Sequence, residues 1–298
     1  MIEHINWQRI WNGRGVLAWL LRPVSWIYGL LWQLRLVLYE WGWLKSQRLP
    51  VPVLVVGNVW VGGVGKTPIT MELTQQLQAL GWRPGVLSKG HGRVAKHTCM
   101  VSAQSQAHEV GDEPLWIHRK TGVPVAVGHS RAEAGALLLA THPHINLLIC
   151  DDGLQHLALT HDLALCVFDQ RRVGNGWLLP AGPLREPWPG RHAHSERMVI
   201  ASTEQPPWAT PWSITRTLDT VATNGWGQKI ALSDITGPVG ALAGIAQPHL
   251  FWQALESKGL QLAQRMARPD HDPWLDWQPQ GLSTWVCTAK DAVKLWPR

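Results

Sequence analysis

The sequence has little cysteine, tyrosine and phenylalanine, and it carries few charges. Among its 298 residues are four cysteines, two tyrosines and two phenylalanines, and charged side chains make up 16%. The cysteines lie far apart and form no CxxC pair, which argues against a disulfide scaffold or a zinc ribbon and fits a reducing cytosol. Glycine (28) and proline (21) are common but follow no period, which excludes a collagen-like fibre. Because 45% of the residues are hydrophobic, the chain can bury a substantial core and is not expected to be disordered.

Tryptophan and basic residues are what the sequence has in excess. Its 20 tryptophans favour places that are half apolar and half wet, which include membrane interfaces. Lysine plus arginine (27) minus aspartate plus glutamate (21) gives a formal charge of +6. That charge suits an anionic partner, such as a nucleotide, a nucleic acid, or a phosphorylated or membrane-bound substrate. The length is enough for two domains of ordinary size.

The most hydrophobic stretch, residues 16–43, predicts a membrane-associated helix. Its longest uncharged run, 23–34, is shorter than the ~20 apolar residues that cross a bilayer. On a helical projection the polar and small residues fall in a narrow stripe, and apolar residues fill the remainder, as in a helix that lies in the membrane interface. The stripe holds Arg22, Ser25, Gly29, Gln33 and Glu40. An amphipathic helix packed on the protein's own core would show the same pattern. We expect anchoring, and the pattern leaves open whether the helix spans the bilayer.

A phosphate-binding loop is predicted where the apolar run 53–56 meets the glycine-rich segment GNVWVGGVGKT (57–67). A strand, a glycine-rich loop and a helix are the context that such a loop needs, because its backbone N–H groups then surround phosphate oxygens at a helix N-terminus. The nucleotide-binding residues would be Gly62, Gly63, Val64, Gly65, Lys66 and Thr67. Lys66 would reach the β- and γ-phosphates of ATP, and the Thr67 hydroxyl would bind Mg²⁺. Trp60 stands where the motif has its first glycine, and a glycine-rich turn before an ordinary helix is the alternative interpretation.

A second apolar run, 146–150, ends in Asp151 and Asp152, followed by Gly153. An acidic residue at the carboxyl end of a buried strand is where an α/β sheet holds Mg²⁺ beside a phosphate-binding loop. Two adjacent carboxylates repel each other unless a cation or hydrogen bonds compensate. Taken alone the segment could be a turn. Together with the phosphate-binding loop, it predicts a Mg²⁺ site at Asp151, Asp152 and Thr67.

Eight short segments follow one another in a fixed order between residues 57 and 295. They are GNVWVGGVGKTP (57–68), SKGHGR (88–93), VGDEP (110–114), DDGLQH (151–156), LLPAGPLREP (178–187), ALAGIAQP (241–248), PDH (269–271) and TAKDAVKL (288–295). In these segments the sequence resembles the tetraacyldisaccharide 4′-kinases, the lipid A 4′-kinases of Gram-negative bacteria, and its N-terminal stretch resembles the family's membrane anchor. DDGLQH and LPAGPLRE are specific to that family, whereas a phosphate-binding loop alone is not.

The resemblance implies a kinase that uses ATP and Mg²⁺. It would transfer the γ-phosphate to the 4′-hydroxyl of a tetraacyldisaccharide 1-phosphate, which gives the bis-phosphorylated lipid A precursor lipid IVA. The resemblance implies Asp112 as the catalytic base, His271 as its partner and Lys66 as the phosphate-binding lysine. Further active-site positions that it marks are Lys89, Glu113, Arg185 and Glu186. It also places the protein at the inner membrane with its active site on the cytoplasmic face, acting on lipid, with no nucleic acid and no obligate protein partner.

Five positions depart from the residues that are usual in the family. They are Trp60 (usually a small hydroxyl residue), Lys89 (Arg), His91 (Tyr), Asp272 (His) and Ala289 (Glu). Lys89 keeps a positive charge but loses the bidentate fork of arginine, so we expect a weaker or differently aimed phosphate contact there. The departures leave the predicted nucleotide, metal and base positions intact, so the expected reaction class stands.

Several polar residues have two interpretations. His156 is either a ligand or a loop residue that fixes the DDG turn, and Asp270 either orients the neighbouring imidazole or caps the next turn. Arg131 is interpreted as a solvated charge at a helix start. The pair Arg171–Arg172 is interpreted in the same way, with contacts to lipid phosphates as the alternative. The segment 174–191, rich in glycine and proline, is long enough for a loop that faces substrate.

Alternating patterns along the chain predict an α/β fold of the P-loop NTPase type. Strands are expected at 53–57, 84–87, 123–127, 145–150, 163–168 and 197–201, and helices at 66–80, 113–120 and 130–141. The alternation predicts a mainly parallel sheet with helices on both faces, followed by a smaller C-terminal α/β lobe with a helix around 248–258. We expect an N-terminal membrane-associated helix (1–44), a P-loop kinase core (45–205), and a linker with the smaller lobe (206–298). Asp112 and His271 then belong to different lobes, and the active site would form when the lobes close.

Two other functions compete with the kinase. The segment VGGVGKT (61–67) resembles the KGGxGKT loop of partition- and iron-protein-type ATPases, which are nucleotide-switched positioning modules at membranes. That class needs a lysine where this chain has Val61. An inactive relative kept as a scaffold is the third hypothesis. Nucleotide-dependent dimerisation would distinguish the switch, which requires it, from the kinase, which does not.

Overall fold

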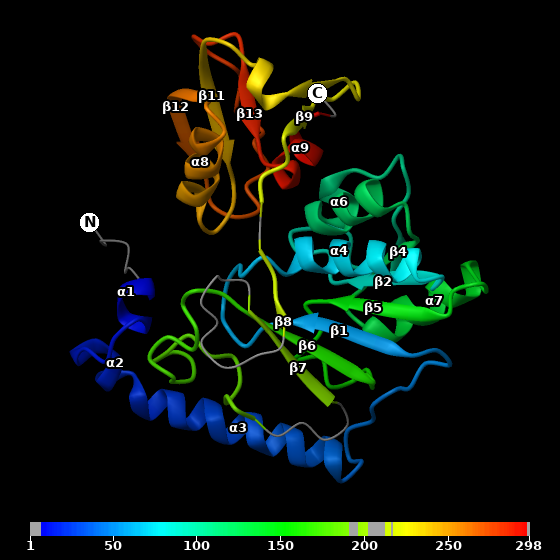
Figure 1. Ribbon diagram of the computed structural model, residues 1–298. Coiled ribbons are helices and arrows are strands. Elements are labelled where there is room, and N and C mark those ends of the chain that lie inside the picture. Colours follow the sequence, from blue (N-terminus) through cyan, green and yellow to red (C-terminus); the bar gives the residue numbers. More distant parts are fainter. Residues whose placement is uncertain (1–6, 191–195, 202–211, 216, 297–298) are drawn as a thin grey trace.

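An eight-stranded sheet occupies the centre of the molecule in the computed structural model, which describes residues 7–190, 196–201, 212–215 and 217–296 (Figure 1). The strand order is β3-β4-β2-β5-β1-β6-β7-β8. The strands are β1 (Val53–Gly57), β2 (Pro84–Ser88), β3 (Cys99–Met100), β4 (Val125–Val127), β5 (Leu147–Asp151), β6 (Leu163–Phe168), β7 (Glu196–Ala201) and β8 (Trp212–Ser213). Neighbouring strands are parallel except β3, which runs antiparallel to β4. The predicted mainly parallel sheet is therefore confirmed.

The central strands form because their residues are apolar and covered on both faces of the sheet. Every residue of β2 and β5 is buried, which is typical of parallel strands between two layers of helices. In the register of the sheet, Val56 of β1 lies beside Asp151 of β5. The loop after β1 and the aspartates after β5 therefore start at the same edge. The six predicted strands end within two residues of the observed ones, whereas β3 and β8 are too short to leave a pattern in the sequence.

Helices cover both faces of the sheet. Those of the core are α4 (Lys66–Ala79), α5 (Ala107–Val110), α6 (Asp112–Thr121) and α7 (Arg131–Thr141). On one face, Thr70 of α4 hydrogen-bonds Asp151 of β5, and α6 packs on α4. On the other face, Gly135 of α7 packs against Leu148, which points away from the side of Asp151 because side chains alternate along a strand.

A smaller lobe lies above the central sheet in Figure 1 and has a parallel sheet of its own, in the order β12-β11-β13. Its elements are β11 (Pro238–Ala243), α8 (Pro248–Ser257), β12 (Gln261–Ala267), β13 (Trp285–Cys287) and α9 (Ala289–Leu295). A hairpin of β9 (Val221–Thr223) and β10 (Lys229–Ala231) and a 3₁₀ turn (Leu232–Asp234) precede it. Its core includes Val239, Ala241 and Leu255. The helix α9 packs on α6, so the lobe rests on the core next to Asp112.

The predicted boundary between core and smaller lobe, at residues 205 and 206, lies outside the described residues. So does the proline-rich run 204–211 that suggested it. The two separate sheets and their separate apolar clusters support the division into an N-terminal helix, a core and a smaller lobe. We retain the division as a proposal.

The N-terminal helices lie on the side of the core opposite the smaller lobe (Figure 1). They are α1 (Trp7–Trp11), α2 (Val16–Leu20) and α3 (Arg22–Glu40). The predicted polar stripe of α3 turns its middle toward the core, where Ser25 is buried and a Cβ on Gly29 would meet Leu178. The apolar face points outward and exposes Val24, Trp26, Ile27, Leu30, Leu31 and Leu34. The interpretation in which this face packs on the protein's own core is therefore wrong. Within the described part of the chain, no helix is both long and apolar enough to cross a membrane.

Candidate active site

The loop after β1 has the shape that phosphate binding requires. Gly62 and Gly65 have φ angles of +104° and +77°, which residues with side chains rarely adopt. Gly65 directly precedes Lys66, the first residue of α4. The Lys66 ammonium lies 3.1 Å from Asn58 Oδ1 and 3.4 Å from Asp152 Oδ1. The helix N-terminus and the lysine thus face the same space, where they can receive phosphate.

Trp60 replaces the first glycine of the motif without closing the loop. Its backbone forms an antiparallel bridge with Leu184, an extended conformation that needs no glycine. Its indole is 2% exposed, and the Arg171 guanidinium stacks on it with Cζ 4.6 Å from the ring centroid. The side chain therefore packs beneath the loop, where it does not compete with a phosphate.

Asp151 is a buried carboxylate at the end of β5. It accepts hydrogen bonds from Thr70 Oγ1 at 2.8 Å and from Thr67 Oγ1 at 3.4 Å. Burial, together with the charge of Glu113, raises the pKa of Asp151 to about 7. A carboxylate and a threonine hydroxyl beside a phosphate-binding loop are ligands that Mg²⁺ takes together with phosphate oxygens. A divalent cation would also favour the ionised carboxylate, so the residues present fit the ion.

Asp152 contacts two positively charged side chains, Lys66 and Arg185. It therefore connects the phosphate-binding loop with the loop that contains LPAGPLRE. Arg185 Nη1 donates to its two carboxylate oxygens at 3.2 and 3.3 Å. Burial would raise the pKa of Asp152, but the charges of Lys66 and Arg185 hold it below its ordinary value. Glu186 is fully buried and accepts a hydrogen bond from Gln155 Nε2 at 3.1 Å. Its carboxylate therefore lies behind the loop and does not line the cleft.

Asp112 and His271 meet although they belong to different lobes. Asp112 begins α6, and His271 lies after β12 at a φ angle of +65°. The imidazole Nδ1 lies 3.0 Å from Oδ1 and 3.1 Å from Oδ2 of the carboxylate. Burial would raise the pKa of Asp112, but the hydrogen bond with His271 and the charges of Lys290, His271 and Lys294 lower it to about 2. Burial would lower the pKa of His271, but its hydrogen bond with Asp112 raises it. Asp112 is therefore an ionised acceptor for an Nδ1–H of the imidazole.

Lys290 of α9 binds two carboxylates beside the Asp112–His271 pair. Sequence reasoning gave this lysine no role. Its Nζ donates to Glu113 Oε1 at 2.9 Å and to Asp270 Oδ1 at 2.8 Å, and it lies 3.4 Å from His271 Nε2. Burial would lower the pKa of Lys290, but the neighbouring carboxylates raise it. Asp270 also accepts a hydrogen bond from the backbone N–H of His271 at 3.1 Å, so it fixes the histidine from two sides. The segment TAKDAVKL contained the only signal, since nothing local shows which carboxylates a helical lysine will meet.

Three of the departures from the usual family residues, at Lys89, His91 and Ala289, line the cleft. Lys89 is exposed and lines the cleft. His91 packs on His271 with ring centroids 4.6 Å apart, so it contributes a flat ring to the same place. Ala289 lines the cleft at the start of α9. Asp272 accepts a hydrogen bond from the backbone N–H of Trp274 at 2.8 Å and belongs to the turn that carries His271.

The structure changes two interpretations of polar residues and supports one of the two alternatives for a third. Arg131 is 4% exposed and donates to the Gly128 carbonyl at 2.7 Å, so its interpretation as a solvated charge is wrong. Arg171 likewise donates to the carbonyl of Gly63 at 2.6 Å and supports the phosphate-binding loop from below. Burial lowers the pKa of His156 to about 4, and its Nε2 accepts from the backbone N–H of Arg131 at 3.4 Å. A neutral loop histidine beside the DDG turn fits these contacts.

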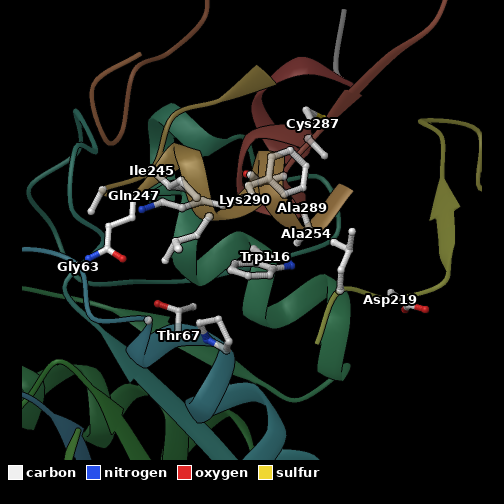
Figure 2. Close-up of a pocket in the computed structure, with 18 of the residues that line it drawn as sticks. Gly63, Thr67, Trp116, Asp219, Ile245, Gln247, Ala254, Cys287, Ala289 and Lys290 are labelled. Atoms are coloured by element: carbon white, nitrogen blue, oxygen red, sulfur yellow. The ribbon is translucent and has the colours of Figure 1, made fainter. Parts of the chain in front are cut away.

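The site opens into a cleft between the two lobes. The phosphate-binding loop and the aspartates form one wall, and residues of β13, α8 and α9 form the other. In Figure 2, Gly63 and Thr67 lie across from Gln247 and Lys290, with Trp116 between the walls. His271 lines the cleft, and Asp112, 4% exposed, lies directly behind it. The volume of about 3030 Å³ is several times that of an ordinary small-molecule pocket, which leaves room for a nucleotide and a second substrate.

Fold and site together define a phosphotransferase of the P-loop class, because a phosphate-binding loop, an acid pair and a carboxylate–imidazole pair share one cleft. A family model described as Tetraacyldisaccharide-1-P 4′-kinase matches residues 17–298. The chain belongs to this family, so the resemblance drawn from its motifs is confirmed.

Individual relatives agree with the family match. The tetraacyldisaccharide 4′-kinase of Acidovorax sp. (strain JS42) is 50% identical over 291 residues, which cover 96% of this chain and 85% of that protein. The tetraacyldisaccharide 4′-kinase of Dechloromonas aromatica (strain RCB) is 45% identical over 301 residues, which cover 96% and 87%. The crystal structure of LpxK from Aquifex aeolicus in complex with ATP superposes with a TM-score of 0.80 at 29% identity, and covers 94% of this chain and 91% of that one.

Proposed function

We propose that this chain, which its family makes a tetraacyldisaccharide 4′-kinase of lipid A biosynthesis, transfers the γ-phosphate of ATP to the 4′-hydroxyl of a tetraacyldisaccharide 1-phosphate. The product would be the bis-phosphorylated lipid A precursor. The observation that carries the proposal is the contact between Asp112 and His271 in the cleft that holds the phosphate-binding loop. A nucleotide-switched positioning module needs no such pair, and a scaffold needs none of the site.

ATP would bind with its phosphates on the backbone of residues 62–67. Lys66 would neutralise charge on the β- and γ-phosphates, and the ATP-bound structure of the Aquifex aeolicus relative supports ATP as the donor. Thr67, Asp151 and Asp152 would hold Mg²⁺, which when bound neutralises phosphate charge as it shifts to the leaving group. The hydrogen bond between Thr67 and Asp151 keeps these two side chains at the mouth of the loop.

The proton of the 4′-hydroxyl would leave toward the Asp112–His271 pair. A sugar hydroxyl is a poor nucleophile, and general-base help typically contributes ~10²–10⁴-fold. We assign Asp112 the proton and His271 the task of orienting it; because the pKa of Asp112 is near 2, this carboxylate is a weak base, and its help depends on its position. Most of the remaining acceleration would come from position and charge, supplied by Lys66 and the arginines.

The acceptor lipid would meet the basic and acidic side chains around the cleft. Lys89 is exposed there, and Arg185 and Glu113 line the wall next to the aspartates. We propose these three as contacts to substrate groups. Glu186, which is fully buried, would act by holding the loop that carries Arg185.

The outward apolar face of α3 supports attachment to a lipid surface. Its row of exposed tryptophan, isoleucine and leucine side chains would enter the interface of the inner membrane, while Ser25 and Gly29 of its polar stripe stay on the core. We propose attachment on the cytoplasmic side, where ATP is available. The lipid substrate would then reach the cleft from the surface on which the enzyme lies.

An assay in detergent micelles tests the proposal. Purified protein with ATP, Mg²⁺ and tetraacyldisaccharide 1-phosphate should give a bis-phosphorylated product, detected by mass spectrometry. ATP binding without product would reject the kinase. Nucleotide-dependent dimerisation under the same conditions would instead favour the switch.

A further inference from the structure

The N-terminal helix touches the active site through one hydroxyl. On the side of α3 that faces the core, Ser25 Oγ donates to the Leu178 carbonyl at 2.8 Å, and Tyr28 Oη donates to the Arg185 carbonyl at 2.6 Å. Ser25 and Tyr28 are three residues apart and therefore neighbours on one helix face. Both bonds end on segment 178–187, which contains the sequence LPAGPLRE, so this segment lies between the outer helix and the site.

Arg185 is held at three places. Its backbone N–H donates to the Val59 carbonyl at 2.7 Å, at the entrance of the phosphate-binding loop. Its guanidinium donates to Asp152, and its carbonyl accepts from Tyr28. The first two contacts fix the residue from the side of the nucleotide, and the third fixes it from the side of the membrane-facing helix. Without the third, the peptide group between Arg185 and Glu186 loses one of the bonds that set its orientation.

We propose that Tyr28 is a positioning residue for phosphoryl transfer, which orients Arg185 over Asp152 through the Arg185 carbonyl. This inference rests on the proposed function, since it assumes that Arg185 acts in the kinase reaction. Burial raises the pKa of Tyr28, so the phenol remains a donor over the whole working range of pH. Helix α3 thereby acts on the reaction itself as well as on membrane attachment.

The test is Tyr28→Phe, which removes the hydroxyl and keeps the ring. We expect kcat to fall about three- to tenfold, a loss of about 0.6–1.4 kcal/mol that lies within the range of one net hydrogen bond. KM for the lipid and binding to phospholipid vesicles should not change, because the apolar face of α3 is intact. A change in KM or vesicle binding with kcat unaltered would overturn the proposal and assign Tyr28 to lipid binding or attachment.

Two matched variants separate positioning from packing. Ser25→Ala removes the neighbouring bond between α3 and the loop without touching Arg185, and Tyr39→Phe removes the other tyrosine hydroxyl of the chain, near the far end of the helix. Both should keep the wild-type kcat. An equal loss of kcat in Ser25→Ala would show a general effect of helix packing and would overturn the proposal.

A double-variant cycle with Arg185→Ala tests the route of the effect. If Tyr28 acts through the Arg185 guanidinium, Tyr28→Phe should change kcat less than about twofold in the Arg185→Ala background. If the kcat losses of the two single variants multiply in the double variant, the proposal is overturned. Failure of the kinase function itself is distinguishable, because the wild-type protein would then make no product, whereas an active wild type with an unchanged Tyr28→Phe variant overturns the positioning role alone.

Discussion

Asp112 and His271 are 159 positions apart in the sequence and share a hydrogen bond of 3.0 Å. Neither residue alone has a suitable chemistry for the reaction. The carboxylate is a weak base because its pKa is about 2, and, against the effect of burial, the hydrogen bond with that carboxylate raises the pKa of the imidazole. In the mechanism we propose, their contact makes the pair useful, since one group would accept the proton and the other would hold the acceptor in place.

Asp112→Asn should lower kcat by about 10²–10⁴-fold, because the amide cannot accept the proton from the sugar hydroxyl. The affinity for ATP should stay the same, since the phosphate-binding loop is untouched. Steady-state kinetics in micelles and a nucleotide-binding titration measure the two quantities. Asp276→Asn, at an exposed aspartate of the smaller lobe, is the matched control. A loss confined to ATP affinity would reject Asp112 as the base.

Lys290→Met should destabilise the protein and slow the reaction. Its ammonium, in a side chain 9% exposed, neutralises Glu113 and Asp270, and removal of one partner from a buried charge cluster costs about 3–5 kcal/mol. Chemical denaturation and kcat, compared with Lys258→Met at an exposed lysine, measure the effect. Wild-type stability in Lys290→Met would show that these contacts contribute nothing.

At the scale of single elements, α3 differs from an ordinary surface helix because its apolar side faces away from the core. Its Ser25 and Trp32 are buried against the core, and most of its other apolar residues face outward. An exposed apolar face of this extent is typical of a surface that lies against lipid or another protein. The hydrogen bonds of Ser25 and Tyr28 fix the helix to the core without burying that face.

Leu31→Glu on this outward face should weaken vesicle binding by at least about tenfold, because a buried leucine side chain contributes about 1.5–3 kcal/mol. Turnover of substrate dispersed in detergent should persist. Gln33→Glu adds the same charge on the polar stripe of the same helix and is the control. Co-sedimentation with vesicles that contain phosphatidylethanolamine and phosphatidylglycerol gives the measurement. If both variants bind these vesicles as strongly as the wild-type protein, the proposed attachment is contradicted.

For the whole molecule, the contact between α6 and α9 decides whether a site exists. Asp112 and Glu113 come from the core, whereas His271 and Lys290 come from the smaller lobe. Each lobe has its own sheet and its own apolar core. The groups to which we assign the chemistry meet where the lobes meet, and the cleft between the lobes leaves room for both substrates.

MgATP should stabilise the folded protein, since it binds that state alone. At about one hundred times its dissociation constant, the gain is about 2.7 kcal/mol, seen as a rise in Tm. Addition of EDTA should remove most of the rise, because Thr67, Asp151 and Asp152 then lack their cation, and it should also stop turnover. Lys66→Met should show little of the rise. An equal rise in Lys66→Met would place the nucleotide elsewhere.

Local patterns were sufficient for the central sheet and its helices. The apolar runs of β1, β5 and β6 and the glycine-rich loop before Lys66 are contiguous in the sequence, so their structure follows from neighbouring residues. The stripe of α3 was also visible, although the pattern could not say which face meets the core. That choice depends on Leu178 and the Arg185 carbonyl, which lie about 150 residues away along the chain.

The amino-acid sequence by itself determined the mainly parallel α/β fold and the family, and it predicted the nucleotide-binding residues, because each rests on short segments whose members are neighbours along the chain. Tertiary structure alone decided that Arg131 is buried, that Arg171 binds the phosphate-binding loop, that Trp60 lies below that loop, and that Lys290 joins Glu113 to Asp270. These facts depend on burial and on charges brought together from distant segments. The physical reason is that the electrostatic surroundings of a side chain are a property of the folded volume around it, which no local pattern contains.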